Sequence, residues 1–222
     1  MVATLIFETA AAIYMVWRYR MSVLARLIVT ALVALAVFQL SEYYVCTGIA
    51  GHGVAWSRLG YVAISTLPPL GLHILHVLGG KKQRVLVATA YASMAGFIAY
   101  FLTYHNAFVG YQCTGNYVIF QIGFWPAIAY GVYYYGWLFT ALAIGLHWLK
   151  DMKQHSKKVL AQAQAIRGLL IGYLVFLLPT AIANSVSPAT RRGIPSIMCG
   201  FAVLFACMLA AYIAPRQLRK RS

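Results

Sequence analysis

The chain has very few acidic residues and few charges of any kind. Asp and Glu together number 3 in 222 residues, and all charged types make up 9%, whereas 62% of the residues are hydrophobic. The mean hydropathy is +0.75. A soluble globular domain carries far more charge on its surface. The composition therefore excludes an ordinary soluble protein and predicts a membrane protein.

Long polar stretches between the apolar runs are also lacking, which leaves no room for a separate soluble domain. A membrane-spanning helix needs about 20 apolar residues. The first run is short, but basic residues follow it rather than precede it, which is unlike a cleaved signal peptide. We expect an all-α fold, one domain over residues 1–222, with seven transmembrane helices near 2–17, 22–40, 58–78, 85–104, 127–148, 168–185 and 194–214.

Basic residues are nearly absent from every second connection between these runs. Of the 18 Lys and Arg residues, only Arg58, Arg191 and Arg192 lie on that side, and the other 15 lie in the alternate connections and the C-terminal tail. Cationic loops are retained in the cytoplasm during insertion. We expect an inner (plasma) membrane protein with its N-terminus outside and its C-terminus in the cytoplasm. The net charge of +15 then reflects topology and anionic lipid, not nucleic acid.

Cysteine is scarce, but two of the four cysteines occupy equivalent surroundings. Cys46 and Cys113 each begin a Cys-Thr-Gly triplet in a connection that the charge pattern places outside. That side of the membrane is oxidising, so we predict a disulfide between them. Two free thiols, or a zinc site with His52 and His105, are alternatives, although the spacings match no compact zinc motif. Cys199 and Cys207 are expected to pack within the last helix.

The third run contains a double proline, Pro68-Pro69, in its middle. Proline removes a backbone donor and disturbs the preceding turn. In lipid, such a break survives where neighbouring helices or hydroxyls bind the freed carbonyls. We expect a kinked helix packed inside the bundle, either purely structural or part of a binding site. In the fifth run, some of the hydroxyls of residues 133–135 should find partners within the bundle.

Polar residues inside the runs are rare, so each is a candidate for function. Glu8, His73, His76 and His147 are the buried polar candidates. Glu8 either binds a proton or contacts a ligand within the bundle, or its carboxylate reaches water near the outer interface. His73 or His76 could hold a haem together with His147, but we expect no metal and no resident cofactor. No catalytic motif is present, so an enzyme is not expected.

Several short motifs resemble those of a known group of membrane sensors. Nearly the whole chain is similar to the seven-helix N-terminal sensory region of certain bacterial histidine kinases. The motifs that carry the resemblance are WSRLGY at 56–61, LPPL at 67–70 followed by His73, GVYY at 131–134, RGLLIG at 167–172 and GIP at 193–195. The resemblance implies a sensory input module whose last helix leads into cytoplasmic signalling domains. No such domain follows here, so we expect signalling through a separate protein.

Two functions follow as expectations. The first is a receptor-like membrane sensor with an outward-facing cup that binds a small ligand. Its mouth would be lined by Glu42, Trp56, His105 and Trp125, and its lid held by the predicted disulfide. A protein partner would dock at the cytoplasmic basic loops or within the membrane. The alternative is a non-catalytic accessory subunit of a larger membrane complex that binds lipid, pigment or haem.

Overall fold

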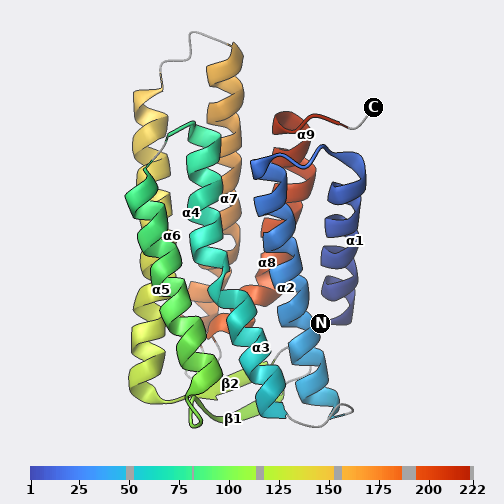
Figure 1. Ribbon diagram of the computed structural model, residues 1–222, viewed down its shortest axis with the longest axis vertical. Coiled ribbons are helices and arrows are strands. Elements are labelled where there is room, and N and C mark those ends of the chain that lie inside the picture. The colour runs from blue at the N-terminus through green and yellow to red at the C-terminus, as the bar shows by residue number, and fades with distance from the viewer. Residues whose placement is uncertain (49–52, 82, 114–117, 153–156, 187–193, 221–222) are drawn as a thin grey trace.

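The structure is a computed structural model of the protein (Figure 1). The residues it describes are 1–48, 53–81, 83–113, 118–152, 157–186 and 194–220. Within these ranges the chain is almost entirely helical, with one small sheet. The elements in chain order are α1 (Val2–Arg18), α2 (Val23–Thr47), α3 (Gly53–Ser65), α4 (Leu67–Gly79), α5 (Arg84–Thr103), β1 (Phe108–Cys113), β2 (Val118–Ile122), α6 (Phe124–Asp151), α7 (Lys157–Val186), α8 (Ile194–Cys207), a π-helical segment (Met208–Ile213) and α9 (Ala214–Gln217).

Five helical stretches among the described residues are long and apolar enough to cross a membrane. They are α2, the pair α3–α4 taken together, α5, α6 and the greater part of α7. This confirms that the protein is built from apolar helices suited to a bilayer. The first and last of the seven predicted runs also form helices, but α1 has 17 residues and the apolar stretch Phe201–Gln217 is likewise short.

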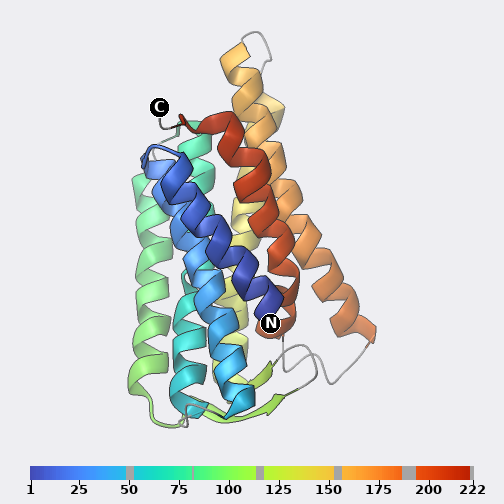
Figure 2. The same cartoon turned by 90° about the vertical axis from the view of Figure 1, so that its right-hand side faces the viewer.

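The helices stand side by side and give the bundle two distinct ends (Figures 1 and 2). The end of α2, the start of α3 and the β1–β2 hairpin lie together at what we call the hairpin end. The start of α2, the end of α4, the start of α5 and α9 lie at the opposite end, which we call the basic end. There α6 and α7 project past α4 in Figure 1, so both extend beyond their predicted apolar runs.

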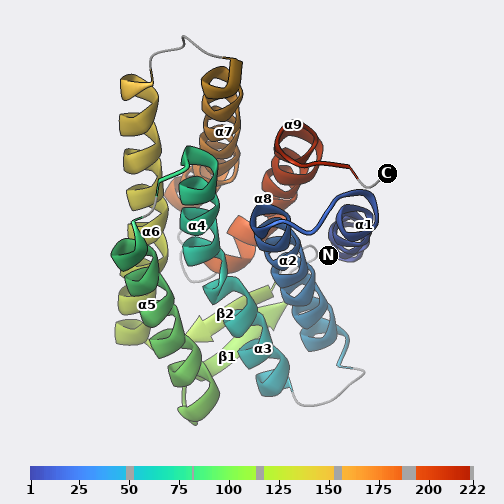
Figure 3. The same ribbon diagram turned by 45° about the horizontal axis from the view of Figure 1, so that its top comes forward.

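The sheet was not predicted, because a plain loop was expected between the fourth and fifth helices. Strands β1 and β2 instead pair antiparallel, with Tyr111 opposite Phe120 and Cys113 opposite Val118. A register shift near Gly110 bends the first strand. Figure 3 shows the hairpin at the ends of α2 and α3. Burial of Val118–Phe120 fixes it there, so part of this connection belongs to the core.

The two ends of the chain meet at the basic end. The amide of Arg20 donates to the carbonyl of Arg219 at 3.0 Å, and Tyr19 forms a short antiparallel bridge with Lys220. Leu218 is buried beside this contact. Helix α1 turns the stripe Glu8, Ala12 and Met15 inward, at the spacing of one helix face. The short first helix is thereby held by both its inner face and the C-terminal tail.

Candidate functional site

The predicted disulfide between Cys46 and Cys113 is present. It joins the last turn of α2 to the last residue of β1, with 5.7 Å between the Cα atoms and a sequence separation of 67. The free-thiol and zinc alternatives for these two residues are therefore wrong. The bond fixes the hairpin to the bundle. His52, the other residue of the zinc alternative, lies outside the described residues.

The four residues expected at an outward-facing mouth lie in different surroundings. Glu42 was expected at the mouth, just beyond the second predicted run, but α2 continues to Thr47 and leaves Glu42 inside, 1% exposed. Its carboxylate accepts from the amide of Val118 at 3.3 Å. The half-buried Trp56 stacks on Tyr44 with 4.4 Å between ring centroids. Trp125 is 76% exposed, and His105 is also exposed.

Aromatic side chains fill the bundle beneath the hairpin. The ring of Tyr61 lies 4.8 Å from that of Phe101 and 5.8 Å from that of Phe120, centroid to centroid. Phe108 of β1 and Tyr130 of α6 pack against the same rings. Helices α3, α5 and α6 and both strands therefore share one cluster. Edge-to-face and offset contacts of this kind add to the stabilisation from burial alone.

An arginine side chain closes the end of α5 at the hairpin end. The guanidinium of Arg58 donates to the carbonyls of Leu102, Tyr104 and His105 at 3.2, 3.3 and 3.4 Å. The last carbonyls of a helix have no partner within it, and a cation there also opposes the helix dipole. Arg58, one of the few basic residues outside the basic end, thus has a local structural role.

The double proline breaks the third predicted helix as expected. The break falls at Thr66, and α3 and α4 are separate helices on either side. In a regular helix the amide of residue 69 would bind the carbonyl of Ser65, and Pro69 has no such amide. The hydroxyl of Tyr133 donates to that carbonyl, and Ser65 Oγ lies 3.2 Å from the hydroxyl of Tyr130. Helix α6 therefore supplies the hydrogen bond that the break removes.

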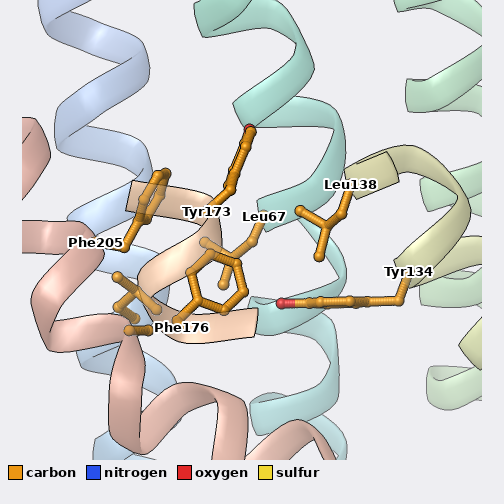
Figure 4. A pocket seen from close by; sticks show the side chains of 8 residues that line it. Leu67, Tyr134, Leu138, Tyr173, Phe176 and Phe205 are labelled. Carbon is orange, nitrogen blue, oxygen red and sulfur yellow. The ribbon is translucent and has the colours of Figure 1, made fainter. Parts of the chain in front are cut away.

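A small apolar cavity lies beside the break (Figure 4). Its volume is about 20 Å³, room for no more than a water molecule. In the figure the hydroxyl of Tyr173 points at α4, and that of Tyr134 points across the cavity toward Phe176. The hydroxyl of Tyr173 is buried and has no hydrogen-bond partner in the described part of the chain. A Cβ atom at Gly71 would collide with it, so a larger residue there would require the tyrosine to shift. The cavity is lined by Leu35, Leu67, Tyr134, Leu138, Tyr173, Phe176, Ala202 and Phe205.

A much larger groove, about 580 Å³ in volume, lies between α4 and α5 at the basic end. Each helix contributes residues at the spacing of a single face, and Val23 at the start of α2 adds one more apolar side chain. None of the lining residues is acidic, and none belongs to the four predicted mouth residues. The groove is lined by Val23, His73, His76, Val77, Gly80, Lys81, Gln83, Arg84, Val87, Ala88 and Tyr91.

Hydrogen bonds hold the two histidines of the groove in fixed orientations. His76 Nδ1 donates to the carbonyl of Leu72 at 2.8 Å, and its Nε2 lies 3.1 Å from the side-chain oxygen of Gln83. His73 Nδ1 lies 3.1 Å from the hydroxyl of Tyr91. Each histidine of α4 is thus tied to a residue in or just before α5. The polar pairs bridge the two walls of the groove.

His147 is not buried, contrary to the prediction. Its side chain is 71% exposed and lies 3.4 Å from the carboxylate of Asp151, one turn further along α6. Its neighbour Trp148 instead packs on His76, with 5.1 Å between ring centroids. A bis-histidine haem needs two ligands that face each other. His147 is absent from the groove lining that contains His73 and His76, so the haem pairing is not formed.

Glu8 is buried as predicted, but not near water. Its side chain is 0% exposed, and neither carboxyl oxygen has a hydrogen-bond partner among the residues that the structure describes. One turn before it, Thr4 donates its hydroxyl to the side-chain oxygen of Gln39 in α2. The carboxyl of Glu42 is close enough to act on Glu8 electrostatically. An unpaired buried carboxyl is costly to fold, so this side chain is a further candidate for function.

Sequence reasoning missed Gln83, Tyr91, Val87 and Ala88 of the groove. The signal lay in two stripes, His73, His76, Val77 and Gly80 on one helix and Arg84, Val87, Ala88 and Tyr91 on the next, each spaced i, i+3, i+4, i+7. Lys81 and Arg84 were interpreted only as markers of topology. No family model, curated protein or solved structure matches this chain, so its function has to be argued from these contacts.

Proposed function

We propose that the protein is a receptor-like sensor of the inner membrane that binds a small ligand in the groove between α4 and α5. In this proposal seven helical spans cross the bilayer, the hairpin end faces outward and the basic end faces the cytoplasm. The proposed ligand site therefore differs from the outward-facing cup expected from the sequence. A ligand would enter the groove from within the membrane and signal to a separate protein.

The observation that carries the proposal is the position of the groove relative to the helix break. Helix α4 runs from the break at Thr66 directly into the groove wall at His73, His76 and Val77. The hydrogen bond from Tyr133 substitutes for backbone pairing at that break. A ligand that pushes α4 away from α5 would turn α4 about this point. Such small rigid movements of helices are a common form of signal transmission.

The basic end offers a route from the groove to a partner. Trp148 of α6 contacts His76 through its ring, and Lys81 lies 5.6 Å from the centroid of the same indole. Both α6 and α7 continue past α4 at this end (Figure 1). A shift of α4 would therefore be felt by the projecting ends of α6 and α7. We propose that the separate signalling protein docks on them.

The accessory-subunit function is retained as a second candidate because of the apolar outer faces. On α5 only Ala90 and Phe101 are buried, and on α6 Val132 and Phe139 are 70% and 59% exposed. Lipid would cover such faces in a lone receptor. A neighbouring subunit could cover them in a larger complex.

The sensor proposal is tested by distance measurements across the basic end. Spin labels at Val85 of α5 and Leu160 of α7, in a background without Cys199 and Cys207, report on the separation of these two helices, both of which contact α4. We expect the distance distribution to shift when bound lipid and small molecules are stripped from the purified protein. Tyr133→Phe should broaden it, since the bond at the break is lost, whereas the matched Tyr135→Phe should not.

A different result would support the accessory-subunit function. If the distribution is the same in loaded and stripped protein, and other membrane polypeptides co-purify at a fixed ratio, the sensor proposal is contradicted. Purification under mild conditions with quantitative mass spectrometry of the associated proteins measures that ratio.

A further inference from the structure

We infer that the groove between α4 and α5 binds an anionic phospholipid from the leaflet at the basic end. This inference rests on the proposal that the groove is the ligand site, and it names the class of ligand. The ligand would insert its negatively charged head group between the ends of the two helices. Its acyl chain would run along the apolar middle of the groove.

The rim of the groove carries cations. Lys81 and Arg84 stand in the short connection between α4 and α5 and at the start of α5, and both are exposed. Arg84 is also the first residue of α5, whose N-cap, Gln83, makes no side-chain capping bond. The amino end of a helix favours negative charge. None of the described residues that line the groove is acidic, so no carboxylate among them repels an anion.

The middle of the groove is apolar. Val77 of α4, Val87 and Ala88 of α5, and Val23 of α2 supply its apolar lining. Further in, the groove ends at the hydrogen-bonded pair His73 and Tyr91, whose polar atoms are already bound to each other. A head group at the rim and a chain beyond it match this order of cationic and apolar residues. A small water-soluble anion would leave the apolar part uncovered.

The basic connections extend this match beyond the groove. A bilayer leaflet rich in anionic lipid attracts cations close to its surface. The rim, with Lys81 and Arg84, lies at the basic end of the bundle, where α9 also lies. An amphiphile with a negative head would reach the groove sideways, without leaving the bilayer. That route suits a groove whose α5 wall lies at the surface of the bundle, since only Ala90 and Phe101 of that helix are buried.

The test is native mass spectrometry of the full chain from nanodiscs that contain phosphatidylglycerol, which is anionic, and phosphatidylcholine, which is not. We expect one tightly held phosphatidylglycerol per protein. The double variant Lys81→Gln/Arg84→Gln should weaken its retention about thirtyfold, because two cations that attract the anionic head group are lost. Ala88→Trp, which fills the groove without changing charge, should also displace the lipid.

Matched controls separate the groove from general surface charge. Arg216→Gln/Lys220→Gln removes the same charge from exposed positions at the same end, outside the groove lining, and should retain the lipid. Thr89→Trp places the same bulk next to Ala88 on α5, again outside the lining. Thermal unfolding of each variant in detergent identifies any that fails to fold. Because one groove variant removes charge and the other adds bulk, the test still stands if one of them does not fold.

Three results would overturn the inference. Equal retention of phosphatidylcholine would exclude the anionic class, and loss of phosphatidylglycerol in the Arg216/Lys220 control would exclude the groove. Retention in both groove variants would exclude the site altogether. Failure of the sensor proposal would look different. The lipid would bind in the groove and could be stripped from it, but the distance between the labelled helices would stay the same.

Discussion

The two ends of the bundle are built on opposite principles. The hairpin end is covalently tied by Cys46–Cys113, filled by interlocking aromatic rings and closed by the Arg58 contacts to α5. At the basic end, α4 and α5 are bridged by a few side-chain hydrogen bonds around a groove of about 580 Å³. One end fixes its helices and the other leaves space between them. The difference indicates an anchor joined to an adjustable region, with the α3–α4 break between them.

Removing the disulfide should produce the largest loss at the anchored end. In the chain-entropy model, a loop of 67 residues predicts about 4 kcal/mol of stabilisation, so Cys46→Ala/Cys113→Ala should lower the free energy of unfolding by about that amount. Thermal unfolding in detergent measures it. Cys207→Ala, at a free and partly buried cysteine, is the control and should change little. If both variants lose the same free energy of unfolding, the disulfide does not anchor the hairpin end.

The aromatic cluster sharpens the comparison between the two ends. Phe101 is fully buried among Tyr61, Phe108 and Tyr130, and Phe101→Ala should cost about 3 kcal/mol through lost contacts and the cavity left behind. Val87→Ala, in the half-buried groove wall, should cost under about 1 kcal/mol. Chemical or thermal unfolding of both variants gives the ratio. A groove variant that costs as much as the cluster variant would show that both ends are equally packed.

A methyl group at the junction between the ends tests how closely α4 packs there. Gly71→Ala should cost about 2 kcal/mol, because the new Cβ would collide with the hydroxyl of Tyr173. Tyr173→Phe removes that hydroxyl, which has no partner, and should itself be nearly neutral. The double variant should then recover much of the loss. If the double variant unfolds as readily as Gly71→Ala alone, the collision is not the cause.

A smaller effect than that of Gly71→Ala is expected at the end of α5. Arg58→Gln removes donors to three carbonyls and a charge opposing the helix dipole, for a loss of about 1 kcal/mol. Hydrogen exchange of the last turn of α5 should rise in this variant. Arg216→Gln is a suitable control, since that guanidinium contacts only Tyr212 in the described hydrogen-bond and cation–π contacts. Unchanged protection near Tyr104 would show that the arginine does not close the helix.

The sequence predicted those features that depend on chemistry within a segment. Apolar run length gave the helices, a triplet shared by Cys46 and Cys113 gave the bond between them, and Pro68-Pro69 gave the break. It also predicted that tyrosine hydroxyls would have partners inside the bundle, as Tyr133 does. Each of these follows from a local rule that tertiary packing does not override.

Features that depend on which faces meet were predicted poorly. Glu42 looked like the end of a helix, but the helix continues and the hairpin covers it. The run VIF at 118–120 was too short to be distinguished from a loop, although it is buried beneath α2 and α3. His147 and Trp148 are adjacent, and only packing decides which one faces His76. The groove has the same origin, since it depends on how far apart packing holds α4 and α5.

The central claim is that α4 and α5 respond to a ligand while the hairpin end stays fixed. Hydrogen exchange measured peptide by peptide, in nanodiscs with and without phosphatidylglycerol, tests it most directly. The account predicts that the lipid slows exchange in residues 67–91 and leaves 53–65 and 108–122 unchanged. A change centred on the hairpin, or none anywhere in 67–91, would contradict it.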